Sequence, residues 1–200
     1  FVFLLLWIYF NGDIFMRQKQ INTNSNSIRI NYPSTDYSLL NKKIREYIDF
    51  QTNNFKNLTL DKVKTNYYLI IDYKEYGYKN IISYVFFLET YNGGAHPDHL
   101  IWTINYDKKI NKIITIKDLI NSDPMILEKL SSFSYNVLSN DNAFKNSNIL
   151  SMLKDGTAPT IDNFKNIVFS NNGLIIYFER YQIAPYYFGE IALTYPMQQG

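Results

Sequence analysis

The side chains best suited to chemistry gather in one short stretch, Tyr91-Asn92-Gly93-Gly94-Ala95-His96-Pro97-Asp98-His99. It holds both histidines of the chain, and histidine is a metal ligand and a proton carrier near neutral pH. The paired glycines allow backbone conformations that other residues avoid, so the loop either aims groups at a ligand or only turns one strand into the next. The candidate binding residues of this stretch are Tyr91, Gly93, Gly94, His96, Asp98 and His99.

One chemistry open to this stretch is metal binding. His96 and His99 could share an ion with Asp98 or Glu89 as a third ligand, since a catalytic zinc needs three protein ligands and an open position. However, Pro97 stiffens the loop between the histidines and His99 is expected to begin a strand, so nothing in the sequence makes the two rings converge. We expect no metal and no cofactor, and a metal-dependent hydrolase using His96 and His99 stays an alternative.

Other catalytic arrangements lack their sequence patterns. No serine lies in the strained strand-to-helix turn of a nucleophilic Ser–His–Asp site. A carboxylate pair for glycoside hydrolysis needs a separation of roughly 5–10 Å, which the sequence does not set for Glu89, Glu179 and Glu190. The chain also has no phosphate loop, no glycine-rich dinucleotide turn and no His-Glu-x-x-His motif. We therefore predict a domain without catalytic activity.

A second stretch, from Arg180 to Gly189, combines four aromatic residues with an arginine and a glutamine. Aromatic residues and arginine dominate binding hot spots, so this loop is either a binding surface or a lid folded onto the core. Because both stretches share aromatic and Gly/Pro character, we predict that they lie at neighbouring strand ends. The candidate binding residues here are Arg180, Tyr181, Tyr186 and Tyr187.

Composition and charge narrow the possible partners. Lys and Arg number 20 and Asp and Glu number 18, and the two signs are interspersed along the chain. Without a basic stripe, nucleic acid is not an expected partner. The chain has no cysteine, which removes disulfides, thiolate metal sites and thiol nucleophiles. Its 18 tyrosines help raise the aromatic fraction to 17%, and partly exposed tyrosine is typical of recognition surfaces.

The N-terminal residues differ from the rest. Residues 1–10 are entirely apolar, although a spanning helix needs about 20 such residues. We expect residues 1–16 to be the remnant of a membrane anchor or signal segment, with a buried strand or helix as the alternative. Residues 17–26 are polar and aperiodic, which predicts a linker. The expected membrane contact is therefore through the N-terminal apolar segment.

Alternation and helical spacing predict the elements that position both stretches. We expect an N-terminal α+β part over residues 27–90 and a C-terminal α+β part over residues 91–200, which shares the same sheet or forms a second subdomain. In the first part we expect a strand at 27–32 ended by Pro33, an amphipathic helix at 36–55, a strand at 63–75, a turn at 76–80 and a strand at 81–90.

The second part begins with a strand at 99–106 and a capping box from Thr115 to Asp118. Asp123 and Pro124 are expected to start a helix that runs to Leu138. A shorter helix at 148–154 should end at Gly156 in the left-handed conformation, followed by a hairpin (166–169 and 174–179) and a last strand at 190–195. The predicted fold class is α+β, with an antiparallel meander sheet, two main amphipathic helices and a C-terminal hairpin.

Separated motifs resemble a known family. Tyr91-x-Gly-Gly-Ala-His-Pro97 is followed by Ile104-Asn105-Tyr106-Asp107, by Thr115-Ile116-x-Asp118-Leu119 and by Phe178-x-x-Tyr181-x-x-Ala184-Pro185-Tyr186-x-x-Gly189. Over residues 27–197 this pattern resembles the domain of unknown function 3298. That domain occurs in the extracytoplasmic part of the lysozyme-sensing anti-sigma-V factor and as the non-catalytic part of some peptidoglycan deacetylases.

The resemblance implies an exported α+β domain, anchored through its N-terminus, without catalysis of its own. In the anti-sigma relatives this region binds lysozyme. We therefore expect an extracytoplasmic domain of the bacterial cell envelope, membrane-anchored or secreted, that recognises lysozyme or another wall-active protein. A peptidoglycan-binding accessory domain is the alternative.

Overall fold

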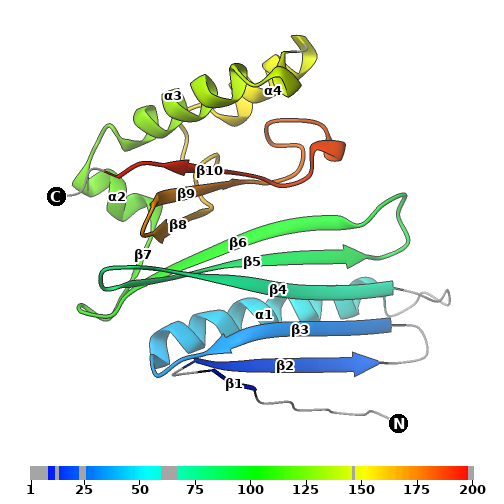
Figure 1. Ribbon diagram of the computed structural model, residues 1–200. Helices are drawn as coiled ribbons and strands as arrows, with labels where there is room; N and C mark the ends of the chain where they lie inside the picture. Colours follow the sequence, from blue (N-terminus) through cyan, green and yellow to red (C-terminus); the bar gives the residue numbers. More distant parts are fainter. Residues whose placement is uncertain (1–8, 12–13, 23–25, 60–66, 146, 198–200) are drawn as a thin grey trace. The chain divides into compact units, whose positions relative to one another are not determined.

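The computed structural model describes residues 9–11, 14–22, 26–59, 67–145 and 147–197 (Figure 1). The chain divides into two compact units. Unit 1 comprises Phe1–Lys74 and Phe86–Leu100, and unit 2 comprises Glu75–Val85 and Ile101–Gly200. Three long strands contribute to both units, namely β4 (Tyr67–Tyr78), β5 (Ile81–Tyr91) and β6 (Asp98–Asp107). The histidine stretch lies in unit 1, and the loop from Arg180 to Gly189 lies in unit 2.

The larger sheet has seven strands in the order β1-β2-β3-β4-β5-β6-β7. Its other members are β1 (Tyr9–Asn11), β2 (Ile14–Asn22), β3 (Asn26–Ser34) and β7 (Lys112–Ile114). β3 pairs with β4 in parallel, and helix α1 (Ser38–Thr59) makes the crossover between them. Lys79 and Asn80 form the tight turn between β4 and β5. The predicted α+β class and meander are confirmed, and the parallel pair is an addition to them.

Unit 1 has its core between α1 and the sheet. The apolar stripe of α1 is buried and the opposite face carries exposed charges, as its spacing predicts. The Tyr47 ring on α1 lies 6.1 Å from the Phe86 ring on β5. The buried stripe consists of Leu40, Ile44, Ile48 and Phe55.

Two predictions for unit 1 are wrong. Residues 17–22 are not a linker but part of β2, antiparallel to β3. A strand of polar residues shows no hydrophobic alternation, so only its pairing reveals it. Pro33 does not end the first strand either. It lies opposite Met16, beyond the part of β3 that pairs with β4, so its missing N–H costs no bond to β4.

The predicted anchor falls mostly outside the described residues. Residues 1–8 and 12–13 are not described, whereas Tyr9–Asn11 form β1 against β2. Within the described part of the chain, no helix is both long and apolar enough to cross a membrane.

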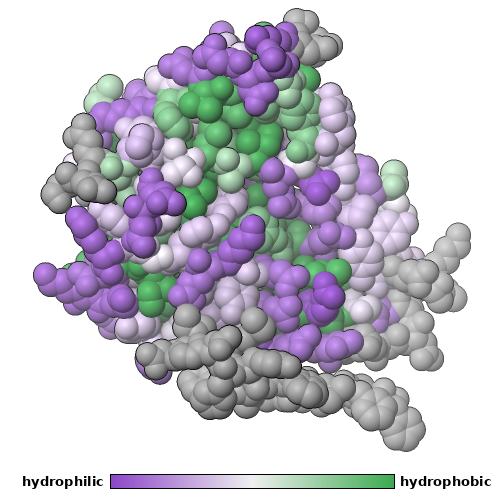
Figure 2. Space-filling model, in the orientation of Figure 1, coloured by the Kyte–Doolittle hydropathy of each residue, from purple (hydrophilic) through white to green (hydrophobic). Residues whose placement is uncertain are grey.

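Unit 2 is built on a smaller antiparallel sheet in the order β10-β9-β8. Helix α3 lies along this sheet in Figure 1, and Figure 2 shows hydrophilic residues along the outer side of the helical layer with hydrophobic residues beneath. Phe133 on α3 makes an edge contact with Tyr195 on β10, with ring centroids 5.2 Å apart. The elements of unit 2 are α2 (Ile116–Ser122), α3 (Ile126–Ser139), η1 (Asn142–Phe144), α4 (Ser147–Gly156), β8 (Ile167–Ser170), β9 (Gly173–Phe178), η2 (Tyr186–Phe188) and β10 (Ile191–Tyr195).

The predicted start of α2 is confirmed. The Asp118 carboxylate accepts hydrogen bonds from the Thr115 N–H and hydroxyl groups, both at 2.8 Å. Together with the Lys112 ammonium group, these bonds lower the pKa of Asp118 to about 2.

Three boundary predictions for unit 2 are wrong. β4 continues through 76–78, and the turn shrinks to Lys79 and Asn80. The N-cap of α3 is Met125, while the Asp123 carboxylate accepts from the Met125 N–H in the turn before the helix. Gly156 is the last residue of α4 but is not left-handed. Glycine is needed there because another backbone segment passes close to it.

Candidate functional site

The loop between β9 and β10, which we call the aromatic loop (residues 180–189), is tied down at its centre. Ile183 and Ala184 are buried, with 1% and 3% of their surfaces exposed. Gln182 acts as a clamp, because its side-chain amide donates to the Gly156 carbonyl at 3.0 Å and to the Asn163 carbonyl at 2.9 Å. Its side-chain oxygen accepts from the Glu179 N–H at 3.1 Å. This part of the loop is therefore fixed to the core, as expected if the loop is a lid.

Gly156 allows the loop to pass close to α4. A Cβ atom at this position would lie 2.0 Å from the Gln182 carbonyl oxygen and 2.8 Å from Ile183 Cγ2. Real atoms do not approach so closely, so only glycine permits this contact. The helix-ending role predicted for this glycine is therefore replaced by a packing role.

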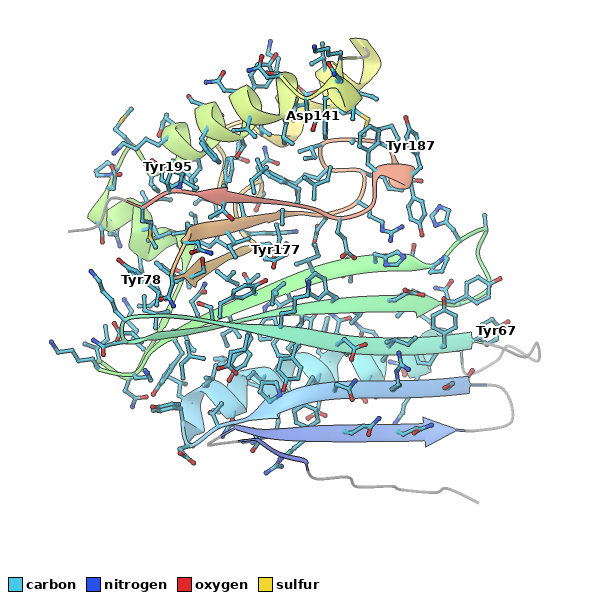
Figure 3. All side chains as sticks on the ribbon, in the orientation of Figure 1. Tyr67, Tyr78, Asp141, Tyr177, Tyr187 and Tyr195 are labelled. Atoms are coloured by element: carbon cyan, nitrogen blue, oxygen red, sulfur yellow. The ribbon has the colours of Figure 1, made fainter. Side chains whose placement is uncertain are left out.

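The tip of the aromatic loop is exposed. Tyr187 lies in the 3-10 turn η2 (Figure 3). It has 77% of its surface accessible, and Tyr181 has 55%. Tyr181 also adopts a positive φ of 64°, which is strained for a residue with a large side chain. The rings of Tyr181 and Tyr186 lie 5.6 Å apart, and the Arg180 guanidinium carbon lies 4.4 Å from the Tyr186 ring centroid. Arg180, Tyr181 and Tyr186 therefore form one cluster, whereas Tyr187 packs against Phe188.

A neighbouring element supports η2. The Phe144 ring of η1 is buried and lies 5.0 Å from the Phe188 ring, and Phe188 lies 4.9 Å from Tyr187. The Asp141 carboxylate caps η1 by accepting from the Ala143 N–H at 2.9 Å. This chain of contacts holds the exposed Tyr187 ring next to a packed aromatic support.

The charges near the loop are not balanced evenly. Glu179 precedes Arg180, but its carboxylate faces Lys165, whose Nζ atom lies 3.2 Å from Oε2. The other oxygen accepts longer bonds of 3.4 Å from the Ile101 N–H and the Asn166 side chain. Among the described residues, the Arg180 Nε is a buried atom without a hydrogen-bond acceptor.

The histidine stretch of unit 1 begins on β5 with Tyr91, whose ring lies 5.9 Å from the Tyr68 ring at an interplanar angle of 30°. Gly93 has a φ of 96°, and a Cβ atom there would lie 3.1 Å from the Tyr67 ring, so glycine is required. Gly94 has no positive φ and no such close contact. The loop therefore depends on only one of its two glycines.

The two histidines have different surroundings. His96 is exposed, with Nδ1 3.0 Å from the Pro97 carbonyl oxygen, and the neighbouring Asp98 is exposed at the start of β6. The His99 side chain is 11% exposed, and its Nδ1 lies 3.9 Å from Glu89. The other Glu89 oxygen accepts from the Tyr68 hydroxyl at 2.6 Å.

The metal-dependent alternative needs a third ligand beside these side chains. Within the described ranges, no group of three or more His, Asp or Glu side chains is placed to hold a metal ion. His99 and Glu89 supply only two.

Several motif residues hold the fold. The Asn105 side chain donates to the Ile167 carbonyl at 3.0 Å and thereby ties β6 to β8. Asp107 accepts from the Lys109 N–H in the next turn. Sequence reasoning missed Tyr68 and Gln182, because neither a lone tyrosine nor a lone glutamine signals a partner far along the chain.

The histidine stretch and the aromatic loop belong to different units. That they lie at neighbouring strand ends stays a prediction.

Known proteins share parts of this sequence and fold. Residues 101–198 match the family model described as "Protein of unknown function (DUF3298)". A relative, the peptidoglycan-N-acetylmuramic acid deacetylase PdaC of Bacillus subtilis strain 168, is 31% identical over 174 residues. The match covers 82% of this chain but only 36% of the length of PdaC.

Two solved structures share the fold. A DUF3298 family protein from Pseudomonas aeruginosa PAO1 matches with a TM-score of 0.67 at 13% identity, covering 96% of this chain and 90% of that one. A DUF3298 member from Bacteroides fragilis NCTC 9343 matches with a TM-score of 0.60 at 18% identity, covering 92% and 91%. At these identities the likeness concerns the fold alone. The family model and the PdaC relative lead to one conclusion: residues 101–198 form a domain of the DUF3298 family.

Proposed function

We propose that this chain is a non-catalytic binding domain of the bacterial cell envelope and that its ligand is peptidoglycan. The observation that carries the proposal is the pair of exposed tyrosines, Tyr181 and Tyr187, on a loop whose base is fixed by the Gln182 clamp. The similarity to PdaC, which is named for peptidoglycan N-acetylmuramic acid, supports this ligand class.

The arrangement suits a sugar polymer. A tyrosine ring offers a flat apolar face for stacking and a hydroxyl group for hydrogen bonding. Fixing the ring before binding reduces the conformational entropy lost on association. Tyr187 is supported from one side by Phe188, and the strained backbone of Tyr181 persists although the side chain is not buried. Strain kept at an exposed aromatic residue points to a use for that side chain.

The test is sedimentation of the full 200-residue chain with purified insoluble peptidoglycan. The full chain is used because β2 lies near the N-terminus and would be lost from a chain shortened there. We expect Tyr187→Ala to weaken binding by about 5–30-fold, since loss of a hot-spot side chain costs about 1–2 kcal/mol. Tyr181→Asn should also weaken binding while leaving stability unchanged or higher, because asparagine tolerates a positive φ.

The matched control is Phe50→Ala, which removes a 61% exposed aromatic ring from α1. This variant should bind like the parent protein. Failure of the parent chain to sediment would overturn the proposed function. Binding that survives both tyrosine substitutions would move the binding surface away from the aromatic loop.

A protein ligand is the second candidate, favoured by the same cluster. Tyrosine and arginine also dominate protein–protein hot spots, so the surface of Arg180, Tyr181 and Tyr187 suits lysozyme or another wall-active protein. Calorimetric titration with lysozyme at low and moderate salt tests this. Saturable binding that persists at moderate salt and falls in Tyr187→Ala would favour recognition of lysozyme. Nonspecific electrostatic attraction would instead weaken as salt rises.

An extracytoplasmic location follows from either ligand. We propose that the chain lies outside the cytoplasmic membrane, secreted or held by its apolar N-terminal segment. Cell fractionation with protease treatment of intact cells that lack an outer membrane tests this. Protection of the chain until the cells are lysed would contradict it.

A further inference from the structure

The Arg180 side chain carries a charge that its surroundings leave uncompensated. Its guanidinium group lies over the Tyr186 ring, 4.4 Å from the centroid, and Nε is shielded from solvent without a hydrogen-bond acceptor among the described residues. A cation–π contact stabilises the position of a cation but accepts no N–H hydrogen bond. The positive charge of Arg180 therefore has an aromatic ring beside it but no carboxylate partner among the described residues of unit 2.

The adjacent carboxylate does not supply the missing partner. Glu179 pairs with Lys165 at 3.2 Å and also accepts from the Asn166 side chain and the Ile101 N–H. In the part of unit 2 that the structure describes, Arg180 takes part in none of the ion pairs. The aromatic loop therefore presents a positive charge over the Tyr186 ring and next in sequence to the exposed Tyr181.

We infer that Arg180 binds a carboxylate of the ligand, and that the aromatic loop is selective for acidic over neutral glycans. The inference rests on the proposed function and deepens it. The guanidinium group presents parallel N–H donors that match the two oxygens of a carboxylate. Nε is shielded, but the terminal nitrogen atoms Nη1 and Nη2 are not among the buried atoms without a partner, so they are the donors offered to a ligand. Carboxylates in peptidoglycan come from two sources: the stem peptide, and the lactyl group of a muramic acid that carries no stem peptide.

The test is calorimetric titration of the full chain with soluble peptidoglycan fragments in matched pairs. One member keeps its carboxylates and the other carries them as neutral methylamides. A peptide-free glycan that retains the lactyl carboxylate and a neutral chitin oligosaccharide separate the two sources. We expect the parent chain to prefer the carboxylate forms by about tenfold or more, and this preference should shrink as salt rises.

Arg180→Gln should bind both members of each pair equally, with the affinity that the parent chain has for the neutral member. Arg180→Lys should keep part of the preference, because it retains the charge but not the paired donors. Thermal unfolding of each variant checks that the fold is intact.

Equal binding of carboxylate and neutral fragments by the parent chain would overturn the inference, as would a preference that survives Arg180→Gln. If the parent chain sediments with insoluble peptidoglycan in a Tyr187-dependent way but shows no carboxylate preference, only this inference fails. If it binds neither fragments nor insoluble peptidoglycan, the proposed function fails with it.

Discussion

The close approach of α4 to the aromatic loop predicts that Gly156→Ala destabilises the protein. The new Cβ atom would lie 2.0 Å from the Gln182 carbonyl oxygen and 2.7 Å from its carbonyl carbon. Ordinary contact requires the backbone segments to separate by about 1 Å or more, and overpacking of this kind costs about 1–3 kcal/mol. Separation would also weaken the bond from the Gln182 side chain to the Gly156 carbonyl, worth about 1 kcal/mol.

The preference of helices for alanine over glycine offsets part of this destabilisation. Gly156 ends a helix without a positive φ, and alanine is favoured over glycine in a helix by about 0.5–1 kcal/mol. We therefore expect a net loss of about 2 kcal/mol in the free energy of unfolding, measured by urea denaturation of the full chain. Because the Gln182 clamp holds the aromatic loop, peptidoglycan binding should fall in the same variant.

Gly77→Ala is the matched control. A Cβ atom added at Gly77 would meet no other atom within 4 Å, and this residue has no positive φ, so alanine should be tolerated there. If Gly156→Ala unfolds at the same urea concentration as Gly77→Ala, the reasoning about the close approach is refuted.

Three further predictions concern individual contacts. The Lys112 ammonium group is the main cause that lowers the pKa of Asp118 in the folded state to about 2. The ionised carboxylate therefore stabilises the fold above the unfolded pKa near 4, and this stabilisation is lost as pH falls from about 4 to 2. Urea denaturation at a series of pH values should show that Asp118→Asn removes this part of the pH dependence. Tyr68→Phe removes the donor to Glu89 and should lower the free energy of unfolding by about 1 kcal/mol, whereas an unchanged urea midpoint would contradict the bond. Asp141→Ala removes the cap of η1, so the free energy of unfolding should fall by about 1 kcal/mol and peptidoglycan binding should weaken. Unchanged stability and unchanged binding would show that η1 does not support the loop.

Much of the fold could be predicted because its elements carry strong local patterns. The stripe of Leu40, Ile44 and Ile48 on α1 and the alternation of β10 both place their apolar residues inward, as the sequence indicates. The capping box of Asp118 is local as well, since its partners lie three residues away. Patterns of this kind need no knowledge of distant residues.

The sequence-based predictions failed where contacts between residues far apart in the chain determine the structure. β2 is a strand because β3 pairs with it, not because of its own residues. Gly156 is required by the approach of Gln182, which is 26 residues away. Tyr68 similarly meets Glu89 only through the sheet. Neither spacing nor residue type reveals such a partner before the fold is known.

The candidate site was predicted in part. The composition of the aromatic loop pointed to Tyr181 and Tyr187, which are exposed, but not to the burial of Ile183 and Ala184 that anchors the loop. Spacing also suggested a shared metal for the histidines, whereas Nδ1 of His96 lies near the Pro97 carbonyl oxygen and Nδ1 of His99 near the Glu89 carboxylate.

The central claim is that peptidoglycan contacts the tip of the aromatic loop, and hydroxyl-radical footprinting with mass spectrometry measures this contact directly. Tyr187 and Phe50 are both highly exposed aromatic residues, at 77% and 61%, so both should be oxidised in the free protein. With saturating peptidoglycan, we predict that oxidation of Tyr187 falls several-fold while that of Phe50 is unchanged. Undiminished oxidation of Tyr187 in fully bound protein would contradict the proposal.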